Sequence, residues 1–194
     1  YKGVWHMPNG TTLGARDSTS NANNGTITNA TATIGKVDGG GNFDGIGDYI
    51  SLPDSASLKP SATLTYSAWI NTDTVIAGVI LGISWDITVP NYDHLQLVST
   101  GEVRFTITTT AITDFNSISK VNNNVWRHVT GVYDGTNMII YIDGVSDRST
   151  SKSGTVVYDP APLPAIGIGA NGASLPITSK IDEVRISSSA RSSD

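Results

Sequence analysis

The sequence contains no cysteine and few charges of either sign. Without cysteine, this chain of 194 residues can form neither a disulfide framework nor a thiolate metal site. It has 12 Lys and Arg residues and 17 Asp and Glu residues, which gives a formal net charge of −5. Nucleic-acid-binding domains cluster basic side chains against phosphates, so this balance argues against nucleic acid as a partner.

Long apolar runs are also missing. A membrane-spanning helix needs about 20 consecutive, mostly apolar residues, and no segment of the chain approaches that length. We therefore expect no membrane insertion. No signal peptide is visible, because a strand-like segment begins at Tyr1. We expect one domain over residues 1–194, excised from a larger protein that carries other domains, with the polar residues 187–194 beginning a linker.

Helix-favouring glutamate is almost absent, whereas strand-favouring residues are plentiful. Glu102 and Glu183 are the only two glutamates, while serine and threonine together exceed a fifth of the chain. β-branched residues and glycine favour strands and turns over helices. Such compositions are common in secreted and surface domains, so we expect an extracellular or cell-surface location.

Short strand-like runs separated by turn residues recur along the whole chain. Val103, Phe105 and Ile107 alternate with polar residues, as in a strand with one buried and one solvated face. Asp134-Gly135 and Asp143-Gly144 supply the positive φ angles of tight hairpins. The pattern predicts an all-β fold, a two-sheet antiparallel sandwich or jelly roll whose last strand returns to its first. The expected strands span residues 3–7, 25–28, 48–52, 64–71, 78–84, 94–99, 102–109, 126–133, 137–142, 165–168 and 181–186.

Several of these segments form an ordered set of motifs. They are VWHM at 4–7, FDGIGDYI at 43–50, LTYSAWI at 64–70, WRHVTGVYD at 126–134, YIDG at 141–144 and IDEVRI at 181–186. In this order they resemble the concanavalin A-like lectin/glucanase superfamily, in the laminin-G-like branch of bacterial and archaeal surface proteins. The resemblance implies two antiparallel sheets, one of them curved, with ligands on the concave face or at its rim. It also implies a calcium ion near the meeting point of the first and last strands.

The implied calcium ion has candidate ligands in the sequence. Calcium takes about six to eight oxygen ligands from carboxylates, amides, carbonyls and water. Asp17, with Asn23 or Asn24, lies in one polar loop, and Asp48 follows in the third segment. Asp182 occupies the family's acidic position at the start of the last strand. A structural calcium held by these residues is expected; the alternative is that the loop side chains only cap turns.

Sugar recognition combines aromatic faces with planar polar groups, and one segment offers both. The predicted ligand-binding residues are Trp85, Asp86, Tyr92, His94 and Arg104. Trp85 and Tyr92 are expected to flank one loop mouth, with a Pro-Asn turn between them. The alternative is that Trp85 belongs to the core and His94 is an ordinary exposed histidine.

The remaining three tryptophans, and the histidine that follows Trp126, are interpreted as structural residues. Trp5, Trp69 and Trp126 lie in apolar strands and are interpreted as core residues. His128 is interpreted as a residue paired across the sheet.

Catalysis has little support in the sequence. Glycoside hydrolysis usually needs two carboxylates about 5–10 Å apart, whereas Glu102 and Glu183 are far apart in the chain. No nucleophile-elbow motif supports a Ser-His-Asp triad either. We expect a non-catalytic extracellular module, with a structural calcium ion, that binds a carbohydrate or cell-surface glycan. The alternatives are a structural or adhesive module of a surface or phage-tail-like assembly without a sugar site and, less favoured, a glycan-cleaving enzyme.

Overall fold

The chain folds into strands almost throughout. The computed structural model describes residues 1–8, 11–85, 92–159, 163–169 and 174–191, and for Trp85 the backbone alone. In chain order the elements are β1 (Gly3–Trp5), β2 (Thr26–Thr28), β3 (Thr31–Ile34), β4 (Gly39–Asp44), β5 (Tyr49–Ser51), the 3-10 turn η1 (Ala56–Leu58), β6 (Leu64–Asn71), β7 (Gly78–Trp85), β8 (Tyr92–Leu97), β9 (Glu102–Thr108), β10 (Ile112–Lys120), β11 (Arg127–Tyr133), β12 (Asn137–Ile142), β13 (Val145–Ser151), β14 (Ala165–Ile166) and β15 (Thr178–Ser187).

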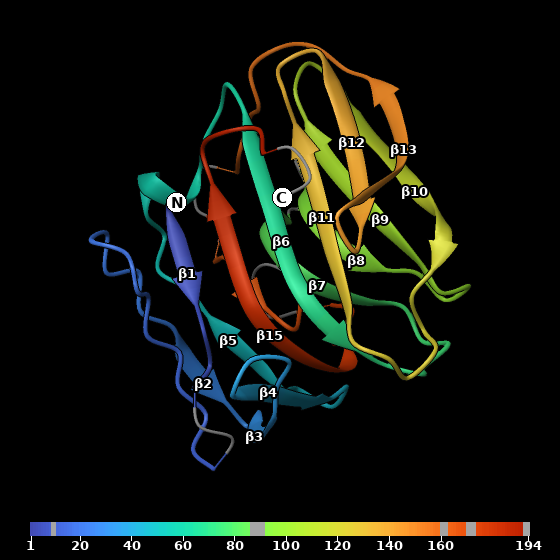
Figure 1. The fold of residues 1–194 in the computed structure, drawn as a ribbon. Helices are drawn as coiled ribbons and strands as arrows, with labels where there is room; N and C mark the ends of the chain where they lie inside the picture. Colours follow the sequence, from blue (N-terminus) through green and yellow to red (C-terminus); the bar gives the residue numbers. More distant parts are fainter. Residues whose placement is uncertain (9–10, 86–91, 160–162, 170–173, 192–194) are drawn as a thin grey trace.

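Two antiparallel sheets pack face to face, as the sequence predicted (Figure 1). The eight-stranded sheet has the order β13-β12-β11-β6-β15-β4-β3, with β1 added beside β15. The seven-stranded sheet has the order β10-β9-β8-β7-β14-β5-β2. No helix among the described residues is long and apolar enough to cross a membrane.

The core lies between the sheets and follows the alternation of the strands. On β6, Tyr66 and Ala68 are fully buried and face the opposite sheet. Phe105 of β9 meets Tyr66 edge-on, with ring centroids 6.1 Å apart at 84°. The Phe105 ring also packs on Gly131 of β11, where an added Cβ would lie 2.6 Å from the ring. Glycine at this strand position lets the two sheets approach closely.

The last strand returns to the first, which confirms the prediction. β1 pairs antiparallel with β15, with Gly3 opposite Ile186 and Trp5 opposite Val184. Trp5 is a core residue, as predicted, and its indole Nε1 donates to the Asn23 carbonyl at 3.0 Å. This pairing joins the two ends of the chain within one sheet.

The predicted hairpin turns are also confirmed. Between β12 and β13, Asp143 and Gly144 both have positive φ angles, of 53° and 78°. Between β11 and β12, Gly135 has a φ of 95°. Positive φ at these positions lets a short turn match the twist of its flanking strands.

Candidate functional site

Three predicted ligand-binding residues come together on the outer face of the seven-stranded sheet. Along β8, Leu95 points into the core, so His94 points outward together with Tyr92. On the neighbouring β9, Arg104 faces the same side, opposite Gln96 in the register. These side chains line a hollow of about 300 Å³, which we call the Tyr92 hollow. Its lining residues are Tyr92, His94, Gln96, Arg104, Thr106, Ile112, Asp114 and Leu175.

His94 forms the floor of the Tyr92 hollow and is only 4% exposed, so it is not an ordinary exposed histidine. Its Nε2 lies 3.2 Å from the Gln96 Oε1 and 3.2 Å from the Thr106 hydroxyl. Burial, with a smaller contribution from the Arg104 charge, lowers the pKa of His94 to about 4. At physiological pH the imidazole is therefore neutral and acts as a hydrogen-bonding group.

Arg104 is held in position by side chains of the neighbouring strand β10. Its Nε donates to the Asn116 side-chain oxygen at 3.0 Å and lies 3.4 Å from an Asp114 carboxylate oxygen. Both contacts use Nε, and the two terminal amino groups make no hydrogen bond within the described part of the chain. Such a fixed guanidinium can donate two parallel hydrogen bonds to a pair of ligand oxygens.

Tyr92 adds an aromatic wall, with its ring centroid 6.5 Å from that of His94 at an angle of 81°. Trp85 pairs with Tyr92 in the backbone register of β7 and β8. Asp86 and the side chain of Trp85 lie outside the described residues. Their roles in ligand binding therefore stay predictions.

Asp17, a predicted calcium ligand, uses its carboxylate to hold the loop that follows β1. One oxygen accepts from the Val4 and Thr19 backbone N–H groups, at 3.0 and 2.9 Å. The other accepts from the Thr19 hydroxyl and the Asn23 backbone N–H, both at 2.9 Å. Burial alone would raise the pKa of Asp17, but the backbone donors outweigh it and lower the pKa. The four hydrogen bonds occupy all the acceptor positions of the Asp17 carboxylate. This is the geometry of the alternative interpretation, in which Asp17 caps a turn.

The other predicted ligands belong to separate networks. Asn23 donates through its amide to the Lys2 carbonyl at 3.0 Å and to Ser57 at 2.9 Å. Asp48 accepts from the Asp44 backbone N–H at 3.1 Å.

Asp182 lies in the middle of β15 rather than at its start, and it is fully buried. It accepts from the backbone N–H groups of Lys36 and Val37 at 2.8 and 2.9 Å, and from that of Glu183 at 2.7 Å. Among the residues that the structure describes, no three His, Cys, Asp or Glu side chains cluster as metal ligands. A calcium ion fits this arrangement only if these hydrogen bonds are exchanged. The ion therefore stays a prediction from the sequence, and the hydrogen bonds do not favour it.

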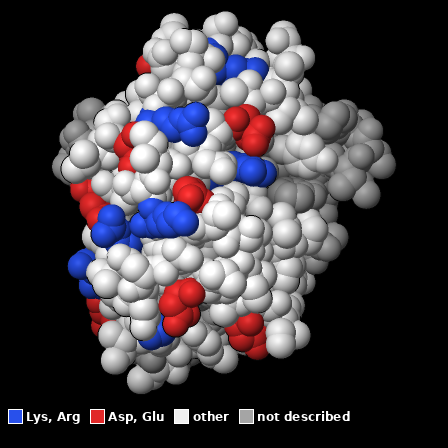
Figure 2. All heavy atoms as spheres, turned by 90° about the vertical axis from the view of Figure 1, so that its right-hand side faces the viewer, with Lys and Arg blue, Asp and Glu red and all other residues white. Residues whose placement is uncertain are grey.

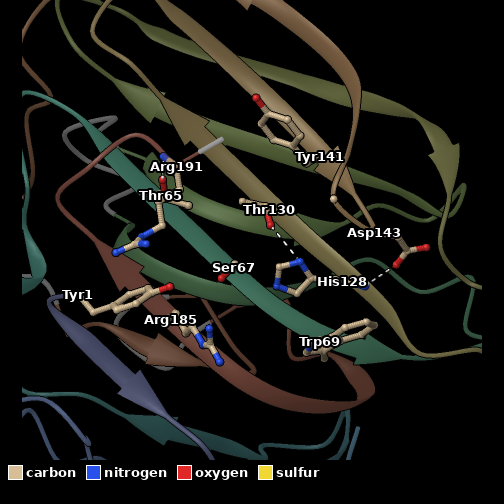
Figure 3. A pocket seen from close by; sticks show the side chains of 11 residues that line it. Tyr1, Thr65, Ser67, Trp69, His128, Thr130, Tyr141, Asp143, Arg185 and Arg191 are labelled. Atoms are coloured by element: carbon tan, nitrogen blue, oxygen red, sulfur yellow. Dashed lines mark hydrogen bonds between the residues drawn. The ribbon is translucent and has the colours of Figure 1, made fainter. Parts of the chain in front are cut away.

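A second hollow, of about 350 Å³, lies on the outer face of the eight-stranded sheet (Figure 3). We call it the Trp69 hollow. Its lining residues are Tyr1, Thr65, Ser67, Trp69, His128, Thr130, Tyr141, Asp143, Gly144, Arg185 and Arg191. Its members come from five separate segments of the chain, so no local sequence pattern predicts it.

The interpretation of Trp69 as a core residue is wrong. Trp69 is partly exposed on the outer side of β6, and its ring centroid lies 5.1 Å from that of His128. The alternation of LTYSAWI carried the signal, because Tyr66 and Ala68 point inward and so Trp69 must point outward. The pairing of His128 across the sheet is confirmed, since it stands opposite Trp69 in the register. The interpretation of Trp126 as a core strand residue is also wrong, because Trp126 is half-buried and lies just before β11.

The fold and the sequence both have known counterparts. A family model described as the concanavalin A-like lectin/glucanases superfamily matches residues 43–194. No curated protein matches the chain by sequence. Domain 4 of an extracellular GH43 arabinanase from Geobacillus stearothermophilus, solved with arabinotriose, is similar with a TM-score of 0.76 and 22% identity, over 97% of this chain and 92% of that one.

Two further solved structures have a similar fold. The binding domain of Paraclostridial Mosquitocidal Protein 1 has a TM-score of 0.70 and 17% identity, over 92% of this chain and 47% of that one. Domains LG4-5 of the mouse laminin α1 chain have a TM-score of 0.62 and 17% identity, over 81% of this chain and 44% of that one. At these identities the similarity establishes the fold, and the sequence match establishes the family. The chain belongs to the concanavalin A-like lectin/glucanase superfamily.

Proposed function

We propose that this chain is an extracellular, non-catalytic module that binds a carbohydrate in the Tyr92 hollow. The observation that carries the proposal is the combination of fixed planar polar groups, from His94, Gln96 and Arg104, with the aromatic ring of Tyr92. Ring hydroxyls pair with such groups, while the C–H surface of a sugar contacts aromatic and apolar side chains. Ile112 and Leu175 supply that apolar surface at the edge of the hollow.

The similar solved structures support the same assignment. The arabinanase domain was solved in complex with arabinotriose, and the mosquitocidal protein's domain is a binding domain. The arabinanase itself is extracellular. These similarities make arabinotriose a rational first ligand to test.

A binding role accounts for the Tyr92 hollow better than a glycosidase does. Hydrolysis normally needs two carboxylates across the scissile bond, and Asp114 is the one carboxylate among the described residues that line the hollow. The Asp114 side chain is 49% exposed.

The proposal predicts saccharide binding that depends on Arg104. A glycan array, followed by isothermal titration of the purified chain with arabinotriose and the best array ligands, measures the binding. Arg104→Gln removes the guanidinium and its parallel hydrogen bonds, so we expect about tenfold weaker binding or more. Tyr92→Leu keeps bulk but removes the aromatic face, and it should weaken binding as well.

Arg16→Gln is the matched control, because Arg16 is exposed and lines neither hollow. It removes the same charge and should bind like the wild type. A chain that binds no saccharide on the array contradicts the proposal and favours the structural or adhesive alternative. Saccharide binding that both Arg104→Gln and Tyr92→Leu leave intact would place the site elsewhere.

A further inference from the structure

The Trp69 hollow brings aromatic rings and arginines to opposite sides of one shallow floor. Figure 3 shows Tyr1, Arg185 and Arg191 on one side, and Trp69, His128 and Tyr141 on the other. Between them, β6 and β11 present only short polar side chains, from Thr65, Ser67 and Thr130. The volume of about 350 Å³ is within the range of small-molecule sites, about 300–1,000 Å³.

Arg191 carries a positive charge that no acidic side chain neutralises within the described residues. Its guanidinium carbon lies 3.8 Å from the centre of the Tyr1 ring, and its Nε donates to the Ser187 hydroxyl at 3.2 Å. The stacking fixes the plane of the guanidinium, so its remaining donors are held ready for a planar acceptor.

Arg185 approaches the same tyrosine from the neighbouring strand, with its guanidinium carbon 5.7 Å from the Tyr1 ring centre. One terminal amino group binds the Glu183 carboxylate at 2.5 Å. Its Nε is buried and has no hydrogen-bond partner in the part of the chain that the structure describes. Arg185 nevertheless lines the hollow, so its guanidinium adds a second positive charge on the same side as Arg191.

The acidic groups near the Trp69 hollow are already paired. Asp143 binds Arg127 at 3.0 Å and accepts from the His128 backbone N–H at 2.8 Å. Lys36 adds a further positive charge, with its ammonium nitrogen 4.7 Å from the centre of the Trp69 ring. The balance of charge at the hollow therefore favours an anion over a neutral or cationic ligand.

We propose that the Trp69 hollow is a second binding site, and that its ligand is a saccharide that carries a carboxylate, such as a hexuronate. The carboxylate is bound by Arg191 and Arg185, and the sugar ring lies against Trp69 and Tyr141. Guanidinium groups match carboxylates in a two-bond geometry, and aromatic faces match sugar C–H surfaces. The site is on the opposite sheet from the Tyr92 hollow, so each proposal can be tested independently of the other.

The test compares trigalacturonate with uncharged galactotriose, added to the isotope-labelled chain and followed by amide NMR and isothermal titration. Trigalacturonate should shift amides of β6, β11 and β15 and bind more tightly than galactotriose. Arg191→Gln should weaken trigalacturonate binding about tenfold, the usual cost of one charge-assisted contact. Arg185→Gln should weaken it too, whereas Arg16→Gln, which removes an exposed arginine that lines neither hollow, should leave it unchanged.

The imidazole of His128 gives a second readout. Burial, and then the charge of Arg185, lower the pKa of His128, while Asp143 acts weakly in the opposite direction. A carboxylate bound beside Arg185 offsets that positive charge, so the pKa of His128 should rise when trigalacturonate is present. NMR titration of the imidazole measures this shift directly.

Several outcomes would overturn the proposal. These are no trigalacturonate binding at millimolar concentration, equal binding of galactotriose, or weakening only by Arg104→Gln. Inorganic phosphate that shifts the same amides while trigalacturonate does not would show a simple anion site in place of a saccharide site.

Discussion

At the scale of single residues, Asp93 is a carboxyl group buried in the core of the sandwich. It is 0% exposed, because it points inward from β8 on the same side as Leu95. One oxygen accepts from the Thr108 backbone N–H at 3.1 Å, and the other has no hydrogen-bond partner among the described residues. Burial raises the pKa of Asp93 well above its usual value.

The direction of that shift sets its effect on stability. The folded chain holds the Asp93 proton more tightly than the unfolded chain, whose aspartate pKa is about 3.9. The favourable contribution is therefore full below about pH 4 and is lost as the pH rises through the raised folded pKa. At neutral pH Asp93 lowers the stability of the fold.

Asp93→Asn should remove this penalty. The amide keeps the shape and the acceptor for Thr108, so we expect a gain of about 1–3 kcal/mol in the free energy of unfolding at pH 7.5. At pH 3.5 the gain should vanish. Urea denaturation at both pH values measures it, with exposed Asp73→Asn as the control. A variant less stable than the wild type at pH 7.5 would contradict this account of Asp93.

At the scale of elements, a bulge in β15 decides which side chains reach the Trp69 hollow. The register of β15 against β6 shifts between Asp182 and Arg185, and Glu183 has a φ of 52°. Ile181 and Val184 both point into the core, although they would face opposite sides of a regular strand. The bulge therefore turns Arg185 to the outer face, where it meets Tyr1.

Glu183, at the centre of the bulge, neutralises part of the Arg185 charge. Its carboxylate binds Arg185 at 2.5 Å and the His6 Nδ1 at 2.6 Å, and it is 5% exposed. Glu183→Gln keeps the size but removes the charge. We expect the melting temperature to fall, by about 2–4 °C for each kcal/mol lost, and trigalacturonate to bind several-fold more tightly.

Calorimetry of Glu183→Gln and titration with trigalacturonate check the two effects together. Glu102→Gln is the matched control, because Glu102 lies on the other sheet beside Lys120. Unchanged or weaker binding in Glu183→Gln would show that the charge of Arg185 does not attract the ligand.

The strands that the sequence did not predict share a physical cause. β3, β10 and β13 are edge strands, and β4 lies beside an edge. On β13 only two positions are even half-buried, so the alternation that marked β9 is absent there. β4 opens with three glycines, which are depleted in strands. All three pair with β3, and Gly41 also pairs with Ile181 of β15. Burial imposes a pattern on central strands and so made them predictable, whereas most edge strands lack that pattern; the edge strand β2, predicted as residues 25–28, is an exception.

The two hollows also differ in how far the sequence predicts them. Tyr92, His94 and Arg104 were predictable because β8 and β9 are adjacent in both sequence and space. The Trp69 hollow joins Tyr1 to Arg191 from the two ends of the described chain, and the topology alone brings these residues together.

At the scale of the whole molecule, charge is distributed in mixed pairs rather than in one field. On the face seen from the side of β10 and β13, basic and acidic side chains alternate (Figure 2). Arg104 with Asp114 and Lys120 with Glu102 are such pairs. Because salt screens exposed pairs of this kind, their contribution to folding is small, about 0–1 kcal/mol each. Stability therefore rests mainly on the core and on the way the loops are tied to the sheets.

Two of those loops are held by Asp17 and Asp182, two of the expected calcium ligands. Asp17 holds the loop after β1 with four hydrogen bonds, and Asp182 holds residues 36 and 37 against β15 with two. Since these donors already satisfy the carboxylates, we expect calcium and chelator to give the same melting temperature. Asp17→Ala should lower it equally in both conditions, because it leaves buried backbone N–H groups without an acceptor at a cost of about 1–3 kcal/mol for each.

Differential scanning calorimetry with calcium chloride and with chelator, on the wild type and both Asp17→Ala and Asp182→Ala, measures this. A ligand that binds only the folded state must raise the melting temperature by mass action. A calcium-dependent rise that either alanine variant abolishes would therefore show that the loop exchanges its backbone donors for the ion. In that case the carboxylates that now hold these two loops by hydrogen bonds would hold them through calcium.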